Sequence, residues 1–146
     1  MNEPAAKSGH MTPAVIECWL QFMESGDSTV LHDLLHPDAT FYSPAVFTPQ
    51  AGRSRVQAYL VAAEKMFAGS SFTYTDRWYR DSSALLEFEV ELSGVRIEGV
   101  DLIQWNSDGQ ITIFKVMIRP LRGLQTVVDI MGALLGRQTQ ADIPAR

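Results

Sequence analysis

The sequence predicts an α+β fold in which helices pack on one face of a mostly antiparallel sheet. Residues 12–69 contain three segments with the apolar spacing of helices, and residues 71–119 contain four strand-like segments. Short, turn-rich connections join these four strands, and such strands pair as an antiparallel meander. A further amphipathic helix is expected over residues 121–135, ended by Gly136.

The three N-terminal helices are bounded by residues that begin or end helices. The first is expected to begin at Thr12-Pro13, because Thr can cap a helix and Pro suits its first turn, and to end at Gly26. A short second helix is expected to stop at Pro37 and to be followed by the extended segment DATFYSPAVF. The third helix is expected between glycines, over residues 53–68.

The four strands read SFTYTDRWYR, ALLEFEVEL, VRIEGVDLIQW and QITIFKVMIR. If Ser93-Gly94 forms a two-residue loop, Leu86 pairs with Asp101 and Phe88 with Gly99. If Asp108-Gly109 forms the next loop, Ser107 pairs with Gln110, and Asp101 pairs with Val116. Both hairpins then place apolar side chains on the same face, an agreement that supports the two registers.

The register of the first hairpin has two solutions. A three-residue loop over residues 81–83 places Phe72, Tyr74, Asp76 and Trp78 on the shared face. A two-residue loop places Thr73, Thr75, Arg77 and Tyr79 there instead. We prefer the first solution because it keeps the aromatic residues inside.

Asp101 is the unusual residue of this shared face, because its expected neighbours are apolar. A carboxylate in such a place loses hydration, so its pKa should rise, and an unpaired charge there would cost several kcal/mol. We interpret Asp101 as a functional carboxyl that lines a pocket. The alternative is a structural Asp satisfied by a buried Arg, a Trp N–H or a backbone donor.

The opposite face of the sheet mixes charged and apolar side chains. Glu91 faces Arg96, but Glu89 faces Glu98, which requires a basic group from elsewhere. The apolar residues of this face indicate a homodimer surface; they are Val100, Leu102, Ile113 and Met117.

Composition narrows the classes of function. The chain has 146 residues, 46% of them hydrophobic, which fits a single domain over residues 12–136 between flexible tails at 1–11 and 137–146. The net charge is −5 without a basic run, so nucleic acid and membranes are poor partners. Cys18 is the only cysteine and is expected to be buried. With no apolar leader and no span of ~20 apolar residues, a cytoplasmic protein is expected.

Three other groups of polar residues have simpler interpretations. HDLLH spaces His32 and His36 like two metal ligands on a helix, but no third ligand is evident, so surface positions are favoured. Asp76 could share a site with Asp101, although pairing with Arg77 or Arg80, or exposure to water, is favoured. Basic side chains near the end of the sheet are expected to pair with acidic neighbours rather than gate a pocket; they are Lys115, Arg119 and Arg122.

The order and spacing of four motifs resemble the nuclear-transport-factor-two-like superfamily, especially its SnoaL-like polyketide cyclase and ketosteroid isomerase branches. The motifs are MTPAVIECWLQFMESGD, LLHPDATFYSP, AGRSRVQAYL and VDLIQWNSDGQITIFKV, and the resemblance covers roughly residues 11–135. It implies a cone-shaped barrel, in which a curved sheet wraps a helix around a deep apolar pocket, and it implies a dimer.

The resemblance can be carried to single positions. The late-strand Asp of ketosteroid isomerase matches Asp101, its helical Tyr falls on Trp19, and its general-base Asp falls on Ser43 before Pro44. That isomerase is a worked case of a carboxylic acid kept neutral at pH 7. Ser43 cannot replace a carboxylate base, so the same two-Asp mechanism is not expected. The Asp-Arg-Asp arrangement of limonene-epoxide hydrolases is absent, whereas SnoaL-like cyclases use a single pocket Asp.

The resulting expectation is a pocket for a small apolar molecule with a carbonyl group. Asp101 would be its acid/base, without cofactor or metal, because neither a Gly-rich phosphate loop nor a metal set is evident. The alternative is a non-catalytic binding module or dimeric scaffold. The expected pocket residues are Trp19, which would donate through its indole N–H, and Tyr42, Ser43, Tyr59, Tyr74, Asp76, Trp78, Phe88, Phe114 and Val116.

Overall fold

A computed structural model of the protein describes residues 11–139, with side chains described up to residue 136. The expected tails therefore fall outside the described residues, apart from Met11 and the last helical residues. The helices are α2 (Ala14–Ser25), α3 (Ser28–Leu34), α4 (Arg53–Phe67) and α5 (Leu121–Thr139). The strands are β1 (Leu35–Tyr42), β2 (Gln50–Ala51), β3 (Thr73–Tyr79), β4 (Ser83–Leu92), β5 (Val95–Trp105) and β6 (Ile111–Arg119).

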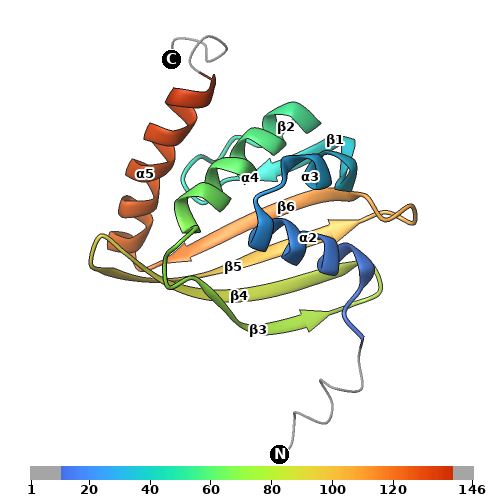
Figure 1. Cartoon of the computed structure of the whole chain (residues 1–146), viewed down its shortest axis with the longest axis horizontal. Helices are drawn as coiled ribbons and strands as arrows, with labels where there is room; N and C mark the ends of the chain where they lie inside the picture. The colour runs from blue at the N-terminus through green and yellow to red at the C-terminus, as the bar shows by residue number, and fades with distance from the viewer. Residues whose placement is uncertain (1–10, 140–146) are drawn as a thin grey trace, which may run out of the picture.

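The strands form one curved, open sheet in the order β2-β1-β6-β5-β4-β3 (Figure 1). This confirms the α+β class and the predicted meander of β3 to β6, all of whose pairs are antiparallel. β1 joins β6 in parallel, and α2, α3 and α4 lie over the concave face of the sheet (Figure 1). α5 follows β6 and packs beside α4.

Most helix boundaries agree with the sequence, and the differences have local causes. Gly26 ends α2 in a left-handed conformation, with a φ of 71°. Asp27 caps α3 by accepting a hydrogen bond from the Thr29 amide. This helix already ends at Leu34, because β1 begins at Leu35, two residues before Pro37. α5 continues past Gly136 to Thr139.

The register of β4 with β5 is confirmed, with Leu86 opposite Asp101. The register of β5 with β6 is confirmed at Asp101 and Val116, but not at the turn. There the amide of Asn106 donates to the carbonyl of Gln110, so the loop is one residue longer than expected. A bulge after Gln104 compensates for the extra residue and restores the predicted pairing.

Neither predicted register of the first hairpin holds along the whole of β3. Tyr74 faces inward, as the three-residue loop predicts, but it lies opposite Phe88 rather than Val90. The two-residue loop holds nearer the turn, where Asp76 lies opposite Glu87. The chain between these pairs contains one extra residue, Thr75, which makes a bulge. Beyond the bulge the facing is reversed, so the side chain of Tyr79 turns inward with Ala84.

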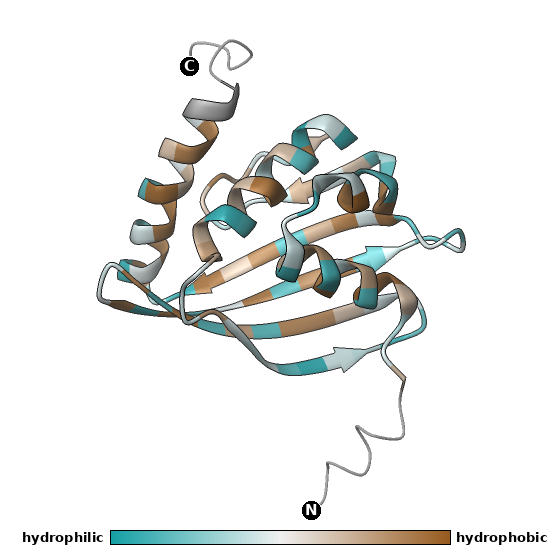
Figure 2. Cartoon of the chain, viewed as in Figure 1, coloured by the Kyte–Doolittle hydropathy of each residue, from teal (hydrophilic) through white to brown (hydrophobic). Residues whose placement is uncertain are grey.

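The main core lies between the sheet and the helices, and Figure 2 shows hydrophobic residues alternating with hydrophilic ones along the central strands. Its largest fully buried side chains include Trp19, Phe22, Phe88 and Phe114. Cys18 is half-buried against this core.

The outer face carries the charged and apolar mixture that the sequence predicts. Glu89 does lie opposite Glu98, and the basic group that this pairing requires is Arg119. Its guanidinium lies 2.5 Å from the Glu98 carboxylate. Lys115 lies over the ring of Tyr42, 4.9 Å from its centroid. Both basic side chains therefore have partners on the outer face, away from the concave side.

Candidate functional site

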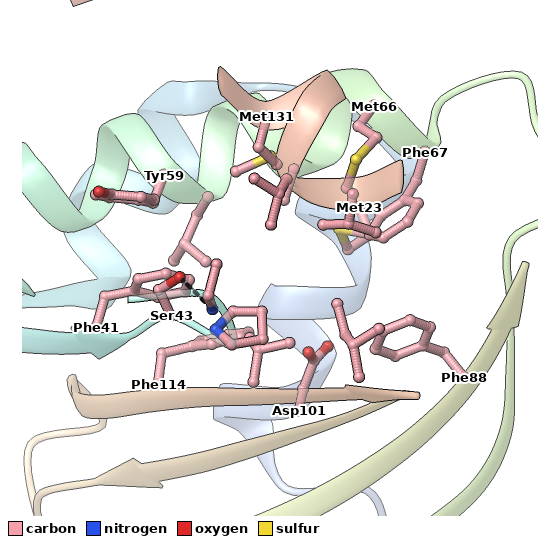
Figure 3. Close-up of a pocket in the computed structure, with 18 of the residues that line it drawn as sticks. Met23, Phe41, Ser43, Tyr59, Met66, Phe67, Phe88, Asp101, Phe114 and Met131 are labelled. Atoms are coloured by element: carbon pink, nitrogen blue, oxygen red, sulfur yellow. Dashed lines mark hydrogen bonds between the residues drawn. The ribbon is translucent and has the colours of Figure 1, made fainter. Parts of the chain in front are cut away.

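An apolar cavity of about 80 Å³ lies between the concave face of the sheet and the helices α2, α4 and α5. Six aromatic residues and three methionines form about half of its wall (Figure 3). The lining residues are Trp19, Met23, Phe41, Ser43, Pro44, Ala45, Tyr59, Leu60, Ala63, Met66, Phe67, Phe88, Asp101, Phe114, Val116, Ile118, Val127, Val128 and Met131. Such a wall suits an apolar ligand with very few polar groups.

Among the described residues that line this wall, Asp101 provides the only carboxyl group. The alternation of β5 turns its side chain to the concave face, where it points from the sheet toward the helices (Figure 3). Its neighbours across the strands are Leu86 and Val116. Only 6% of its surface is exposed.

A directed chain of two hydrogen bonds ends on Asp101. The indole Nε1 of Trp19 donates to the hydroxyl of Tyr74 at 2.9 Å. The same hydroxyl donates to Oδ2 of Asp101 at 2.5 Å. In this structure Tyr74 accepts the only N–H of the Trp19 side chain, so that group does not point into the cavity as a free donor. Trp19 contributes its ring to the cavity instead.

The pKa of Asp101 is raised from 3.8 to about 7, because burial disfavours the carboxylate. The hydrogen bond from Tyr74 acts in the opposite direction and stabilises the carboxylate. Burial also raises the pKa of Tyr74 well above its ordinary value, so this phenol keeps its proton near neutral pH. Asp101 is therefore a buried carboxyl that changes its protonation state near pH 7.

Six of the ten expected pocket residues line the cavity with Asp101. They are Trp19, Ser43, Tyr59, Phe88, Phe114 and Val116. Tyr74 does not line the cavity; it contacts Asp101 through its hydroxyl, and it borders a separate groove beside α2.

The structure places Tyr42, Asp76 and Trp78 outside the cavity. Tyr42 follows the buried Phe41, so the alternation of β1 turns it outward to Lys115. Asp76 and Trp78 follow the bulge of β3 and so face outward with Glu87 and Leu85. The Asp76 carboxylate accepts a hydrogen bond from the Arg77 amide, and Trp78 is 52% exposed.

The pocket residues that sequence reasoning missed come mainly from the helices. Met23, Phe67 and Met131 belong to apolar stripes that the sequence shows, but a stripe does not reveal which members face an open space. The sequence interpretation assigns Tyr42 to the pocket, whereas the structure places its neighbour Phe41 there. Alternation along β1, counted from the buried Ala39, would have found Phe41.

The two histidines of HDLLH do not share a helical face, since α3 ends before His36. His32 lies near Arg53 and Asp33, and Nδ1 of His36 accepts from the Asp38 amide. Within residues 11–139, no group of three or more His, Cys, Asp or Glu side chains could hold a metal ion. No helix in that range is long and apolar enough to cross a membrane.

Comparison with known proteins identifies the family. The family model described as a SnoaL-like domain matches residues 16–114, which include Trp19, Ser43, Tyr74 and Asp101. The chain belongs to the SnoaL-like domain family. No curated protein matches it.

Solved structures agree with this assignment. A steroid delta-isomerase from Pseudomonas aeruginosa is 32% identical, with a TM-score of 0.75 over 88% of this chain and 90% of that one. An uncharacterised protein with a cystatin-like fold from Silicibacter pomeroyi is 28% identical, with a TM-score of 0.79 over 87% and 89%. A candidate polyketide cyclase from Sinorhizobium meliloti shares the fold, at 17% identity and a TM-score of 0.57 over 73% and 95%. The SnoaL-like chain therefore has the fold of a steroid delta-isomerase and of related proteins.

Proposed function

We propose that the cavity binds a small, mainly apolar molecule with a carbonyl group, and that Asp101 moves a proton on it without a cofactor. The observation that carries this proposal is one carboxyl group, with a pKa of about 7, in a wall that is otherwise mainly apolar. A group with such a pKa can serve as acid and as base at neutral pH. The reaction would be an isomerisation, a cyclisation or a lyase step.

In the simplest form of this chemistry, Asp101 acts twice. As a carboxylate it takes a proton from a carbon next to the carbonyl, and the electron pair left behind moves into the enolate. The neutral Asp101 then returns the proton to another carbon of the enolate, so the ligand is isomerised with no net change in its atoms. Ser43 occupies the position where the resembling isomerases have their general-base Asp, so in this chain the proton transfer would fall to Asp101.

The size of the cavity favours a small ligand. About 80 Å³ is much less than the ~300–1,000 Å³ of typical ligand pockets. Methionine side chains are flexible, and Met23, Met66 and Met131 come from three different helices. We infer that the site takes a molecule of about one ring, and that larger ligands require these side chains to move.

A non-catalytic binding module is the second candidate. Ser43 favours it, because its hydroxyl accepts hydrogen bonds from the amides of Ala45 and Val46 and so serves the loop. In such a protein Asp101 would only hydrogen-bond the ligand.

The first test is binding of cyclic ketones, phenols and polyketide-like esters, measured by thermal shift on the wild type and on Asp101→Asn. We expect a carbonyl compound to raise the Tm of the wild type but not of the variant. Turnover of that compound would separate enzyme from binding module. If no compound raises the Tm, and Asp101→Asn is much less stable at every pH, Asp101 is structural and the proposal fails.

We also propose that two copies pair through the outer sheet face, as the sequence indicated. Trp78 and Met117 are 52% and 57% exposed on this face. Leu85 and Leu102 lie between them in the sheet. Glu87, Glu89 and Glu91 of this face lie on β4 and Glu98 on β5, whereas β6 carries Lys115 and Arg119, so a two-fold axis can bring opposite charges together.

Sedimentation at micromolar concentration tests this pairing. We expect a dimer for the wild type and a monomer for Met117→Glu, since a charge at the centre of an apolar interface is costly to bury. Asp33→Glu, which lies on α3 away from this face, should remain dimeric. A wild type that is monomeric at this concentration would contradict the proposed interface.

A further inference from the structure

The hydrogen-bond chain below the cavity has a direction, and this direction decides which oxygen of Asp101 can carry a proton. We propose that Trp19 and Tyr74 are positioning residues that keep the exchangeable proton of Asp101 on Oδ1, the oxygen left for the cavity. The catalytic role of this proton rests on the proposed acid/base function of Asp101. The experiment below does not depend on that function.

The direction follows from the donors that each side chain owns. The indole Nε1 of Trp19 can only donate, and it donates to the oxygen of Tyr74. The hydroxyl of Tyr74 has a single hydrogen, which it gives to Oδ2 of Asp101. Oδ2 is therefore an acceptor in both protonation states, and a proton on neutral Asp101 must sit on Oδ1.

Within the described residues, no second hydrogen-bond donor competes with Tyr74 for the carboxyl group of Asp101. β4 and β6 face Asp101 with Leu86 and Val116, and no described donor other than Tyr74 hydrogen-bonds its carboxyl group. Tyr74 is the titratable group that contacts it, and Tyr59 is the other titratable group of the cavity wall. α5 lines the cavity with Val127, Val128 and Met131, which carry no charge.

The chain is also held in place. Trp19 is 2% exposed, and its ring lies 4.7 Å from that of Phe114, so the indole N–H has a fixed position. Tyr74 packs edge-on against Phe72. A buried indole therefore orients a phenol, and the phenol orients the carboxyl group. At the cavity, Oδ1 donates when Asp101 is neutral and accepts when it is ionised.

The test is the titration of Asp101 in the protein without ligand, followed by carboxyl ¹³C NMR and assigned with Asp101→Asn. Tyr74→Phe removes the donor to Oδ2, so the midpoint should move up by about one pH unit or more. Tyr79→Phe removes the same hydroxyl from the same strand, also on the concave side, and should leave the midpoint unchanged.

The role of Trp19 can be read without replacing it. In the wild type, the chemical shift of its indole ¹H–¹⁵N signal should change with pH, with the same midpoint as the titration of Asp101. This pH dependence should be lost in Tyr74→Phe. Trp19→Phe should raise the midpoint less than Tyr74→Phe does, and should add nothing in the Tyr74→Phe background.

An unchanged or lowered midpoint in Tyr74→Phe would overturn the inference. The inference would also be overturned if the chemical shift of the Trp19 indole signal did not change when Asp101 ionises. Neither result would bear on the proposed function, which fails separately if Asp101→Asn binds and converts the carbonyl ligands as the wild type does.

Discussion

Asp101→Asn is expected to be more stable than the wild type at pH 8, and this advantage is expected to disappear as the pH falls to 4. The pKa of Asp101 is about 7 in the folded protein, against about 4 in an unfolded chain. Between these values the folded state binds one more proton than the unfolded state, so the stability of the wild type falls as the pH rises. Three pH units correspond to about 4 kcal/mol.

Urea unfolding of both proteins at intervals from pH 4 to pH 8 measures this effect. The difference between their free energies of unfolding isolates Asp101 from the other ionisable groups. An amide can still accept the hydrogen bond from Tyr74, so the variant keeps the chain intact. Asp108→Asn, in an exposed turn, controls for the loss of one carboxylate and should follow the wild-type curve. Parallel curves for Asp101→Asn and the wild type would mean that Asp101 ionises freely in the folded protein.

The position of Asp101 could be predicted from the sequence because two independent turns determine it. Ser93-Gly94 places Asp101 opposite Leu86, and the next loop places it opposite Val116. Period-two alternation then makes the apolar face unambiguous. The length predicted for the second turn was wrong, but the pairing predicted for Asp101 was still correct. The bulge after Gln104 restores the register between the turn and Asp101.

The partners of Asp101 could not be predicted in the same way. The bulge at Thr75 reverses the facing of β3, so Tyr74 and Tyr79 both turn inward while Asp76 and Trp78 do not. A bulge accommodates the curvature of the whole sheet, and no local sequence pattern shows that curvature. The contact between Trp19 and Tyr74 joins residues 55 positions apart and depends on how α2 lies over the sheet.

The set of residues that line the cavity also could not be predicted from the sequence. Apolar stripes on α2, α4 and α5 predict burial, and a buried side chain can fill a core or border an empty space with the same pattern. Only the packing distinguishes the two: Phe22 is fully buried and absent from the cavity wall, whereas Met23, its neighbour on α2, lines it.

Gly99→Ala is expected to destabilise the protein by about 1–3 kcal/mol and to disturb the cavity wall. A β-carbon at Gly99 would lie 2.4 Å from the ring of Phe88 and 2.8 Å from the carbonyl oxygen of Met117. The ring lines the cavity, so a shift of the ring changes the cavity wall, whereas the carbonyl belongs to the paired strand β6. Urea unfolding measures the loss, and the affinity for a ligand found by thermal shift should fall with it.

A double-mutant cycle separates the two contacts. In a Phe88→Leu background the ring is gone, so Gly99→Ala should cost less than in the wild type, with a coupling of about 0.5–3 kcal/mol. The cost that remains reports the Met117 carbonyl. Gly132→Ala, in α5 with no atom near its β-carbon, should instead stabilise the protein by about 0.5–1 kcal/mol. If the losses of unfolding free energy were additive, the β-carbon at residue 99 would not clash with the Phe88 ring. Gly99 would then not be required for the position of that ring in the cavity wall.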